Sequence, residues 1–287
     1  MAVITYINIF EEETGKSLSA VAIATYIGIN NNNNILLIST TNHDDKINSS
    51  FFEDSKLKKL RKGIFGTNNI SILDSETGIE GLAKVSKSNK LSPELITNYT
   101  KVVFKGRLEI LPGRQKTSEE MINGNYQNKD NESVDLILKA NMYYDKVIVD
   151  LDTNISLETR ERILDLSDLI VVNCSQNFKS IEKLKEQMER DEFLQSPRTL
   201  LLIWRYDKYS KYNIKNITRY LGEKNKVLAI PYNTLFFEAS NEGTVPDLFI
   251  RLKKIGDSDD RNRLFVNEVK RASENISYRL QELQARR

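Results

Sequence analysis

The sequence holds little of the chemistry that disulfides, zinc sites and imidazole catalysis require. Its 287 residues include one cysteine, Cys174, and one histidine, His43. A single cysteine forms no disulfide within the chain, and a zinc site needs several cysteine or histidine ligands. Ser-His-Asp or Cys-His catalysis would have to use His43, which lies in a polar stretch. These scarcities exclude a disulfide scaffold and a cysteine-histidine zinc site, disfavour imidazole catalysis, and predict a cytoplasmic protein.

An excess of charge and long apolar runs are also missing. The chain carries 42 Lys+Arg against 40 Asp+Glu, a formal net charge of +2. Nucleic-acid binding would therefore depend on a local basic patch. No apolar run approaches the roughly 20 residues of a membrane-spanning helix, and no basic segment precedes the first apolar stretch. We therefore expect the protein to be neither secreted nor transmembrane.

What is present is a repeated alternation of short apolar runs with helical patterns. Apolar residues make up 39% of the chain and charged residues 29%, which is typical of a globular protein. The runs occupy residues 3–10, 35–38, 108–111, 147–149, 169–172, 200–203 and 227–230. Helical patterns occupy residues 18–29, 156–166 and 180–193. Buried strands that alternate with helices predict an α/β fold, a doubly wound, mostly parallel sheet with helices on both faces.

The same patterns suggest how the chain is divided. Residues 1–256 are expected to form one domain, with an irregular elaboration over 42–105, and the polar stretch 123–131 is expected to be a loop. Residues 257–287 predict a C-terminal amphipathic helix, because apolar residues recur there at helical spacing. Glutamates dilute its positive charge. A helix that packs on its own domain or a second subunit is therefore favoured over a membrane-binding helix.

The first candidate site follows the first predicted strand, where Gly15-Lys16-Ser17 opens a helix. In a phosphate-binding loop this triplet supplies backbone N–H groups, a lysine for the β and γ oxygens and a hydroxyl for Mg²⁺. The front of that motif is absent, because Phe10 stands where a glycine is required, and residues 11–13 are glutamates that repel phosphate. The alternative is an acidic first turn that complements the helix dipole, capped by Thr14 or Gly15.

Asp150 is a second candidate, at the end of a predicted buried strand. A carboxylate there can hold Mg²⁺ through water. The alternative is an ordinary strand end with a turn that starts at Asp152 or Asn154. Two further stretches, residues 205–212 and 230–243, interleave aromatic residues with cations or polar residues after later strands. They could contact bases or phosphates, or simply be solvated loops.

In order along residues 3–252, these features resemble the ParA/MinD branch of deviant P-loop ATPases. That family's K-G-G-x-G-K-[ST] loop falls on residues 11–17, and its Y-D-x-I-I-I-D strand falls on 144–150. Its N-R-Y strand end falls on 204–206, and its I-P segment, which lies against adenine, begins at Ile230. The resemblance implies ATP and Mg²⁺ as ligands and a homodimer. It implies nucleotide contacts from Gly15, Lys16, Ser17, Arg205, Pro231 and Tyr232, with Ser17 and Asp150 toward the metal.

Departures from the family pattern concern the groups that hydrolyse ATP. Glu11 replaces the lysine that reaches the partner's phosphates, and Ser39, Thr40 and Thr41 stand where aspartates prepare water. Trp204 replaces the asparagine that reads adenine. No residue is assigned a catalytic role, and we expect a weak ATPase or a pseudo-ATPase.

Within the branch, the chain looks most like the TadZ/CpaE group. This likeness implies an organiser or docking protein for a Tad-type pilus or secretion apparatus, with protein partners and recruitment from the cytoplasm to the membrane or cell pole. The membrane contact would be indirect or through the C-terminal helix. The alternative is an active ParA-type partition ATPase that binds DNA nonspecifically through residues 56–62 and 205–211. A metabolic P-loop enzyme ranks third, because the site lacks acid-base pairs.

Overall fold

The structure is a computed structural model. It describes residues 1–10, 14–41, 46–53, 78–79, 81–82, 92–113, 127–222, 227–253 and 261–286, and the side chains of 127–131 are outside this description. Much of the 42–105 stretch therefore lies outside the described residues. So do the glutamates at 11–13 and the basic run at 56–62.

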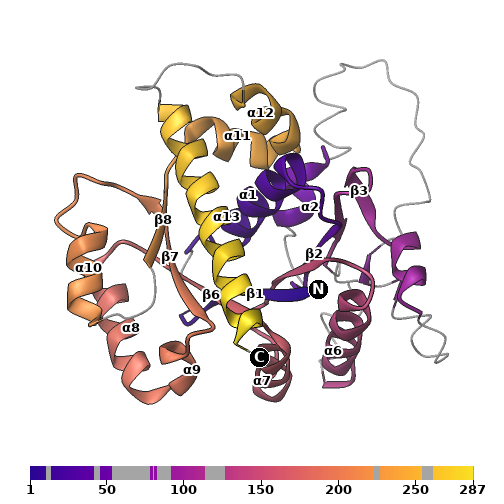
Figure 1. Ribbon diagram of the computed structural model, residues 1–287, viewed down its shortest axis with the longest axis horizontal. Helices are drawn as coiled ribbons and strands as arrows, with labels where there is room; N and C mark the ends of the chain where they lie inside the picture. Colours follow the sequence, from indigo (N-terminus) through magenta and orange to yellow (C-terminus); the bar gives the residue numbers. More distant parts are fainter. Residues whose placement is uncertain are drawn as a thin grey trace, which may run out of the picture.

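The described chain forms one eight-stranded sheet (Figure 1). Its strands are β1 (Ala2–Asn8), β2 (Ile35–Ser39), β3 (Lys101–Phe104), β4 (Leu108–Leu111), β5 (Lys146–Asp150), β6 (Leu169–Cys174), β7 (Thr199–Tyr206) and β8 (Val227–Pro231). Their order is β3-β4-β2-β5-β1-β6-β7-β8, and only β3 runs antiparallel to its neighbour. The predicted doubly wound, mostly parallel sheet is confirmed, and each apolar run of the sequence is a strand.

The strand register places the ends of three strands together. Asp150 is paired with Tyr6 of β1 and with Ser39 of β2, so β5 ends level with both neighbours. The chain runs from β1 outward to β2 on one side, and after β5 it crosses β1 to reach β6 on the other. A crevice forms at such a reversal in doubly wound sheets, and it opens at the carboxyl ends of the strands. The first strand and the helix that follows it lie at this point.

Helices cover both faces of the sheet, as expected. One apolar cluster combines the sheet with α1 (Lys16–Asn30), α2 (Lys46–Phe51), α11 (Thr234–Glu242), α12 (Val245–Leu252) and α13 (Arg261–Ala285). The other cluster combines it with η2 (Glu94–Asn98), α6 (Gln127–Asn141), α7 (Leu157–Leu166), α8 (Phe178–Arg190), α9 (Glu192–Gln195) and α10 (Ile214–Leu221). Each cluster takes alternate residues of the strands, as the pleat requires.

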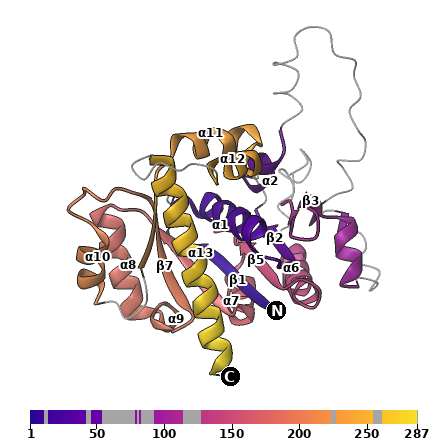
Figure 2. The same ribbon diagram turned by 45° about the horizontal axis from the view of Figure 1, so that its top comes forward.

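Helix α1 lies between the sheet and a second layer of helices. Its alanines Ala20, Ala22 and Ala24 are fully buried, and small side chains allow α2, α12 and α13 to approach it. Figures 1 and 2 show α13, in yellow, crossing that side of the molecule beside α1. The apolar face of α13 is buried here, through Phe265, Val269 and Ile276 among others. Its apolar stripe therefore belongs to the core. No helix among the described residues is long and apolar enough to cross a membrane.

The sequence-based expectations were wrong at three places. The stretch 123–131 is not all loop, because α6 begins at Gln127 and its polar first turns hide the apolar contacts that start at Val134. The pattern 180–193 is two helices, since α8 ends at Arg190 and α9 starts at Glu192. Strand β3 was missed because it is an edge strand whose residues are only partly buried, so its sequence carries no buried run.

Candidate functional site

The triplet Gly15, Lys16 and Ser17, called the glycine-lysine turn below, begins α1 directly after β1. Gly15 is the N-cap in the left-handed conformation, with φ 71° and ψ 24°. Among the described residues no side chain caps the helix, and the first turn of α1 holds no acid. Thr14 is not the cap: its hydroxyl donates to the Asn8 side-chain oxygen instead. The free N–H groups of such a helix start attract anions, so the turn has the local geometry of a phosphate site.

Lys16 does not extend from this turn into solvent. Its ammonium lies 2.9 Å from the Asp150 carboxylate, and it also donates to the carbonyl oxygen of Leu151. Both charged side chains are buried, Lys16 at 8% exposure and Asp150 at 1%. The Asp150 oxygen that faces Lys16 is Oδ1, and among the described residues no donor has hydrogen-bond geometry to it. The contact is therefore an ion pair between the two candidate residues that the sequence placed on different strand ends.

Threonine 40 fixes the backbone beside this pair. Its N–H and its hydroxyl both donate to the carbonyl oxygen of Asp150, each over 3.1 Å. The same hydroxyl accepts from the N–H of Asp152 over 2.8 Å. The neighbouring hydroxyls of Ser39 and Thr41 lie 2.8 Å apart. The last residue of β2 and the two that follow it thus offer hydroxyls where a water-activating carboxylate would be needed. Residues 44 and 45 lie outside the described chain.

The donor set here fits magnesium bound together with a nucleotide. Ser17, part-exposed on the turn, and Asp150, beside the turn's lysine, offer hydroxyl and carboxylate oxygens, which hard cations prefer. Within the described residues, no group of three His, Cys, Asp or Glu side chains could hold a metal ion by itself, in the absence of a nucleotide. When bound, Mg²⁺ would neutralise phosphate charge, with Ser17 and Asp150 as its protein oxygens. Lys16 would be the residue that turns from Asp150 toward the phosphates.

The other three candidate nucleotide contacts are Arg205, Pro231 and Tyr232. No described contact joins any of them to the glycine-lysine turn. Arg205 is exposed and has φ 57°, and it is the only non-glycine residue with positive φ in the described part of the chain. Pro231 ends β8. Tyr232 is 50% exposed, and its ring lies 6.3 Å from that of Phe237. Whether these residues contact a nucleotide stays a prediction.

The residue that does reach the turn is Trp204, which sequence reasoning named only as a departure. A β-carbon built on Gly15 would lie 2.0 Å from Cδ1 of the Trp204 indole. Trp204 is buried at 6% exposure, and its ring lies 5.7 Å from that of Phe236 in an edge-on contact. The one signal in the sequence was a tryptophan, the only one in the chain, at the end of a predicted strand.

The loop after β7 exposes the aromatic and basic residues that the sequence singled out. Tyr209 is 85% exposed with the Lys208 ammonium 5.0 Å from its ring, and Lys211 lies 5.1 Å from the Tyr212 ring. Gln176 holds the loop by donating to the carbonyl oxygens of Asp207 and Tyr212. The loop is thus both solvated and anchored, with cations available at its surface.

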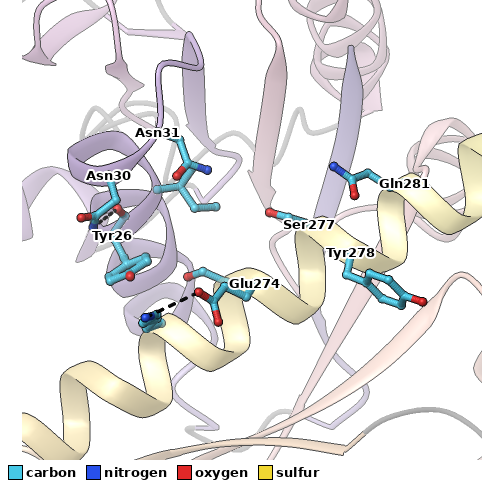
Figure 3. A pocket seen from close by; sticks show the side chains of 10 residues that line it. Tyr26, Asn30, Asn31, Glu274, Ser277, Tyr278 and Gln281 are labelled. Carbon is cyan, nitrogen blue, oxygen red and sulfur yellow. Dashed lines mark hydrogen bonds and ion pairs between the residues drawn. The ribbon is translucent and has the colours of Figure 1, made fainter.

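A separate groove of 410 Å³ lies between the C-terminal end of α1 and α13 (Figure 3). Tyr26, Asn30 and Asn31 line one side, and Glu274 and Tyr278 are among the residues on the other. Burial, and then the Glu274 carboxylate, raise the pKa of the Tyr26 phenol. The groove is at the opposite end of α1 from Gly15, so it is not part of the glycine-lysine site.

Comparison with known proteins gives a fold and no closer relative. No protein-family model and no curated protein matches the sequence. Among solved structures, a ParA family ATPase from Chlorobium tepidum TLS superposes with a TM-score of 0.67 at 15% identity, covering 97% of this chain and 98% of that one. The chain has the ParA/MinD fold.

Two further structures with this fold contain nucleotides. A putative plasmid partition protein from Borrelia burgdorferi B31 bound to AMPPNP has a TM-score of 0.59 at 20% identity, over 99% of this chain and 98% of that one. The septum site-determining protein MinD from Pyrococcus horikoshii OT3, complexed with Mg-ADP, has a TM-score of 0.59 at 13% identity, over 97% and 98%. The matches to structures with the ParA/MinD fold thus cover 97–99% of this chain.

Proposed function

We propose that the protein is a spatial organiser of the ParA/MinD type that binds ATP and Mg²⁺ at the glycine-lysine turn and hydrolyses ATP slowly or not at all. The observation that carries the proposal is the buried contact of Lys16 with Asp150 at the start of α1. A lysine and an aspartate at these places are what a P-loop site uses for phosphate and metal. The nucleotides in the two solved structures just described support the same ligands.

Slow hydrolysis follows from the hydroxyls of the last residue of β2 and of the two residues after it. Ser39, Thr40 and Thr41 are engaged with each other or with the β5 backbone. A hydroxyl of ordinary acidity is a poor general base, so nothing described there prepares a water molecule for attack. In this proposal the nucleotide acts as a conformational ligand, and the homodimer carries the interaction with other proteins.

The finer form of the proposal is an organiser or docking protein of a Tad-type pilus or secretion apparatus, recruited from the cytoplasm to the membrane or cell pole. This form rests on the sequence resemblance to the TadZ/CpaE group. Because the apolar face of α13 is buried in the core, the proposal assigns membrane recruitment to protein partners. Its test is direct binding of the purified chain to the components of such an apparatus.

The test of the nucleotide site is calorimetric titration of ATP and of ADP, each with Mg²⁺, into the purified protein. Ser17→Ala removes the proposed metal ligand and leaves the Lys16–Asp150 pair in place. Ser49→Ala makes the same chemical change on α2, where the hydroxyl donates to Lys46 within the helix. Binding that Ser17→Ala weakens and Ser49→Ala preserves supports the proposal. Absence of binding at millimolar nucleotide refutes the nucleotide site.

A partition ATPase with nonspecific DNA binding is the second candidate, and the exposed loop after β7 favours it. Lys208 and Lys211 are in positions to contact phosphates, and Tyr209 to stack on a base. DNA retention should then fall steeply with salt, and the double variant Lys208→Glu/Lys211→Glu should reduce that dependence. Lys270→Glu, an exposed lysine on α13, is the control. If none of the three substitutions changes DNA retention, the loop after β7 is not a DNA-binding surface.

A further inference from the structure

A row of aromatic rings connects the glycine-lysine turn to the helices that cover it. The indole of Trp204 meets the ring of Phe236 on α11, and Phe236 lies 5.0 Å from Phe265 of α13 and 6.0 Å from Phe249 of α12, centroid to centroid. All four side chains are buried. The indole is therefore held from behind by a packed cluster, with its other edge on Gly15.

The contact with Gly15 leaves no space between the two residues. Three atoms of the indole, Cδ1, Cγ and Nε1, lie 2.0, 2.4 and 2.6 Å from the point where a β-carbon on Gly15 would stand. Real β-carbons do not approach other atoms that closely. The five-membered ring thus rests directly on the backbone of the residue that begins the turn.

A bulge in β7 aims the indole at this place. Trp204 is paired with Ile230 and Tyr206 with Pro231, so Arg205 is an extra residue in the strand. Arg205 takes the left-handed conformation that non-glycine residues avoid. Bulges of this kind reorient a neighbouring side chain, and strained backbone of this kind is concentrated at functional sites.

The Lys16 ammonium and the Trp204 indole are thus both placed at the turn in ways that oppose the binding of phosphate. The ammonium of Lys16 is directed to Asp150 and Leu151. The indole of Trp204 lies against the backbone of Gly15, the residue that begins the turn whose N–H groups a phosphate would approach.

We propose that Trp204 is a plug that competes with nucleotide for the glycine-lysine turn, and that it leaves Gly15 when nucleotide binds. This proposal rests on the proposed nucleotide function and adds a regulatory residue to it. The apparent affinity of such a site equals its intrinsic affinity multiplied by the fraction of molecules in which the plug has left Gly15.

Two kinds of substitution test the plug by calorimetry with Mg-ATP. Trp204→Ala should bind Mg-ATP more tightly than the wild-type chain, by about tenfold or more, and Trp204→Phe should fall between the two. Phe249→Leu is the matched control, because it disturbs the same aromatic cluster without touching Gly15. Its affinity should equal that of the wild-type chain. A rise in affinity for Phe249→Leu as large as that for Trp204→Ala would refute a specific plug.

The wild-type chain supplies a second readout that does not depend on any variant. Its single tryptophan is the plug itself, so emission excited at a wavelength that tyrosine does not absorb reports on Trp204 alone. Saturating Mg-ATP should shift the emission to longer wavelength and raise its quenching by acrylamide. Heat of binding without any change in emission would overturn the proposal, even if the Trp204 variants failed to fold.

The outcomes separate the plug from the nucleotide site. Equal affinities for the wild-type chain and Trp204→Ala would refute the plug and leave the nucleotide site standing. Binding by Trp204→Ala alone would establish both the site and its plug. Binding by neither folded protein would refute the nucleotide site, and the plug with it.

Discussion

The charged groups of Lys16 and Asp150 neutralise each other inside the protein, across 2.9 Å and with almost no exposure to water. They come from the start of α1, which follows β1, and from the end of β5, and the parallel pairing of β1 with β5 brings these two places together. Lysine 16 is therefore a structural residue as well as a candidate phosphate ligand, since its removal would leave a carboxylate buried without its counter-charge.

Lys16→Met should for this reason lower the free energy of unfolding by about 3–5 kcal/mol, the usual cost of an uncompensated buried charge. The double variant Lys16→Met/Asp150→Leu should recover most of the loss. Urea denaturation of the three proteins measures both effects. A single variant as stable as the wild-type chain would show that the Asp150 charge is not confined in the way the structure indicates.

The fold was largely predictable because its strands are buried on both faces. Runs such as 35–38 and 169–172 can be recognised without any partner in view, and their alternation with helices leaves few topologies. Strand β3 and the start of α6 were not predictable in this way. Their residues are held by neighbours on only one side or lie in polar turns, so the local sequence carries no burial signal.

The candidate site was predictable only in part. The meeting of Lys16 with Asp150 follows from two strand ends at one edge of a parallel sheet, which the sequence patterns imply. The contact of Trp204 with Gly15 does not follow from any pattern. It depends on the bulge at Arg205, where the backbone takes a conformation that arginine disfavours. Residue preferences therefore do not predict it.

Gly15→Ala should destabilise the protein through two separable effects. The left-handed backbone costs a non-glycine residue roughly 1–2 kcal/mol, and the overlap with Trp204 adds roughly 1–3 kcal/mol of overpacking. Gly106→Ala isolates the first effect, because Gly106 has φ 67° and no atom of the described residues lies within 4 Å of the point that its β-carbon would occupy. In thermal denaturation, the Gly15→Ala protein should unfold at a clearly lower temperature than the Gly106→Ala protein.

The overlap can be checked by combining substitutions. In a Trp204→Ala background, the added cost of Gly15→Ala should shrink toward that of Gly106→Ala, since the indole is gone. An undiminished cost would mean that the alanine is resisted by the turn itself and not by Trp204.

The C-terminal helix α13 should behave as a core element. Phe265→Ala should cost about 3–5 kcal/mol, because this ring is fully buried among Phe236 and Phe249. Tyr278→Ala on the same helix should change stability by less than about 0.5 kcal/mol, because Tyr278 is 62% exposed. The intact chain should stay in the supernatant when anionic liposomes are pelleted. Sedimentation of the intact chain with the liposomes would contradict this assignment.

Burial raises the pKa of the Cys174 thiol to about 12. At pH 8 the thiol is neutral in the folded protein, so iodoacetamide should label Cys174 only after denaturation.

The raised pKa of the Cys174 thiol also makes the stability of the protein depend on pH. The contribution is complete below the thiol's ordinary pKa of 9.0 and is lost as the pH rises from there toward 12. Wild-type stability should therefore fall more steeply than that of Cys174→Ala between these values, and parallel pH profiles would contradict it.

Arg205 offers a test of whether backbone strain is kept for function. Its φ of 57° is unfavourable for arginine and free for glycine, so Arg205→Gly should raise the free energy of unfolding by up to about 1 kcal/mol. Arg205→Val should lower it, because β-branched residues resist this conformation most. If the arginine contacts nucleotide, as the family resemblance implies, Arg205→Gly should at the same time weaken Mg-ATP binding in calorimetry. A glycine variant that is more stable and binds equally well would assign Arg205 no role beyond forming the bulge that places Trp204.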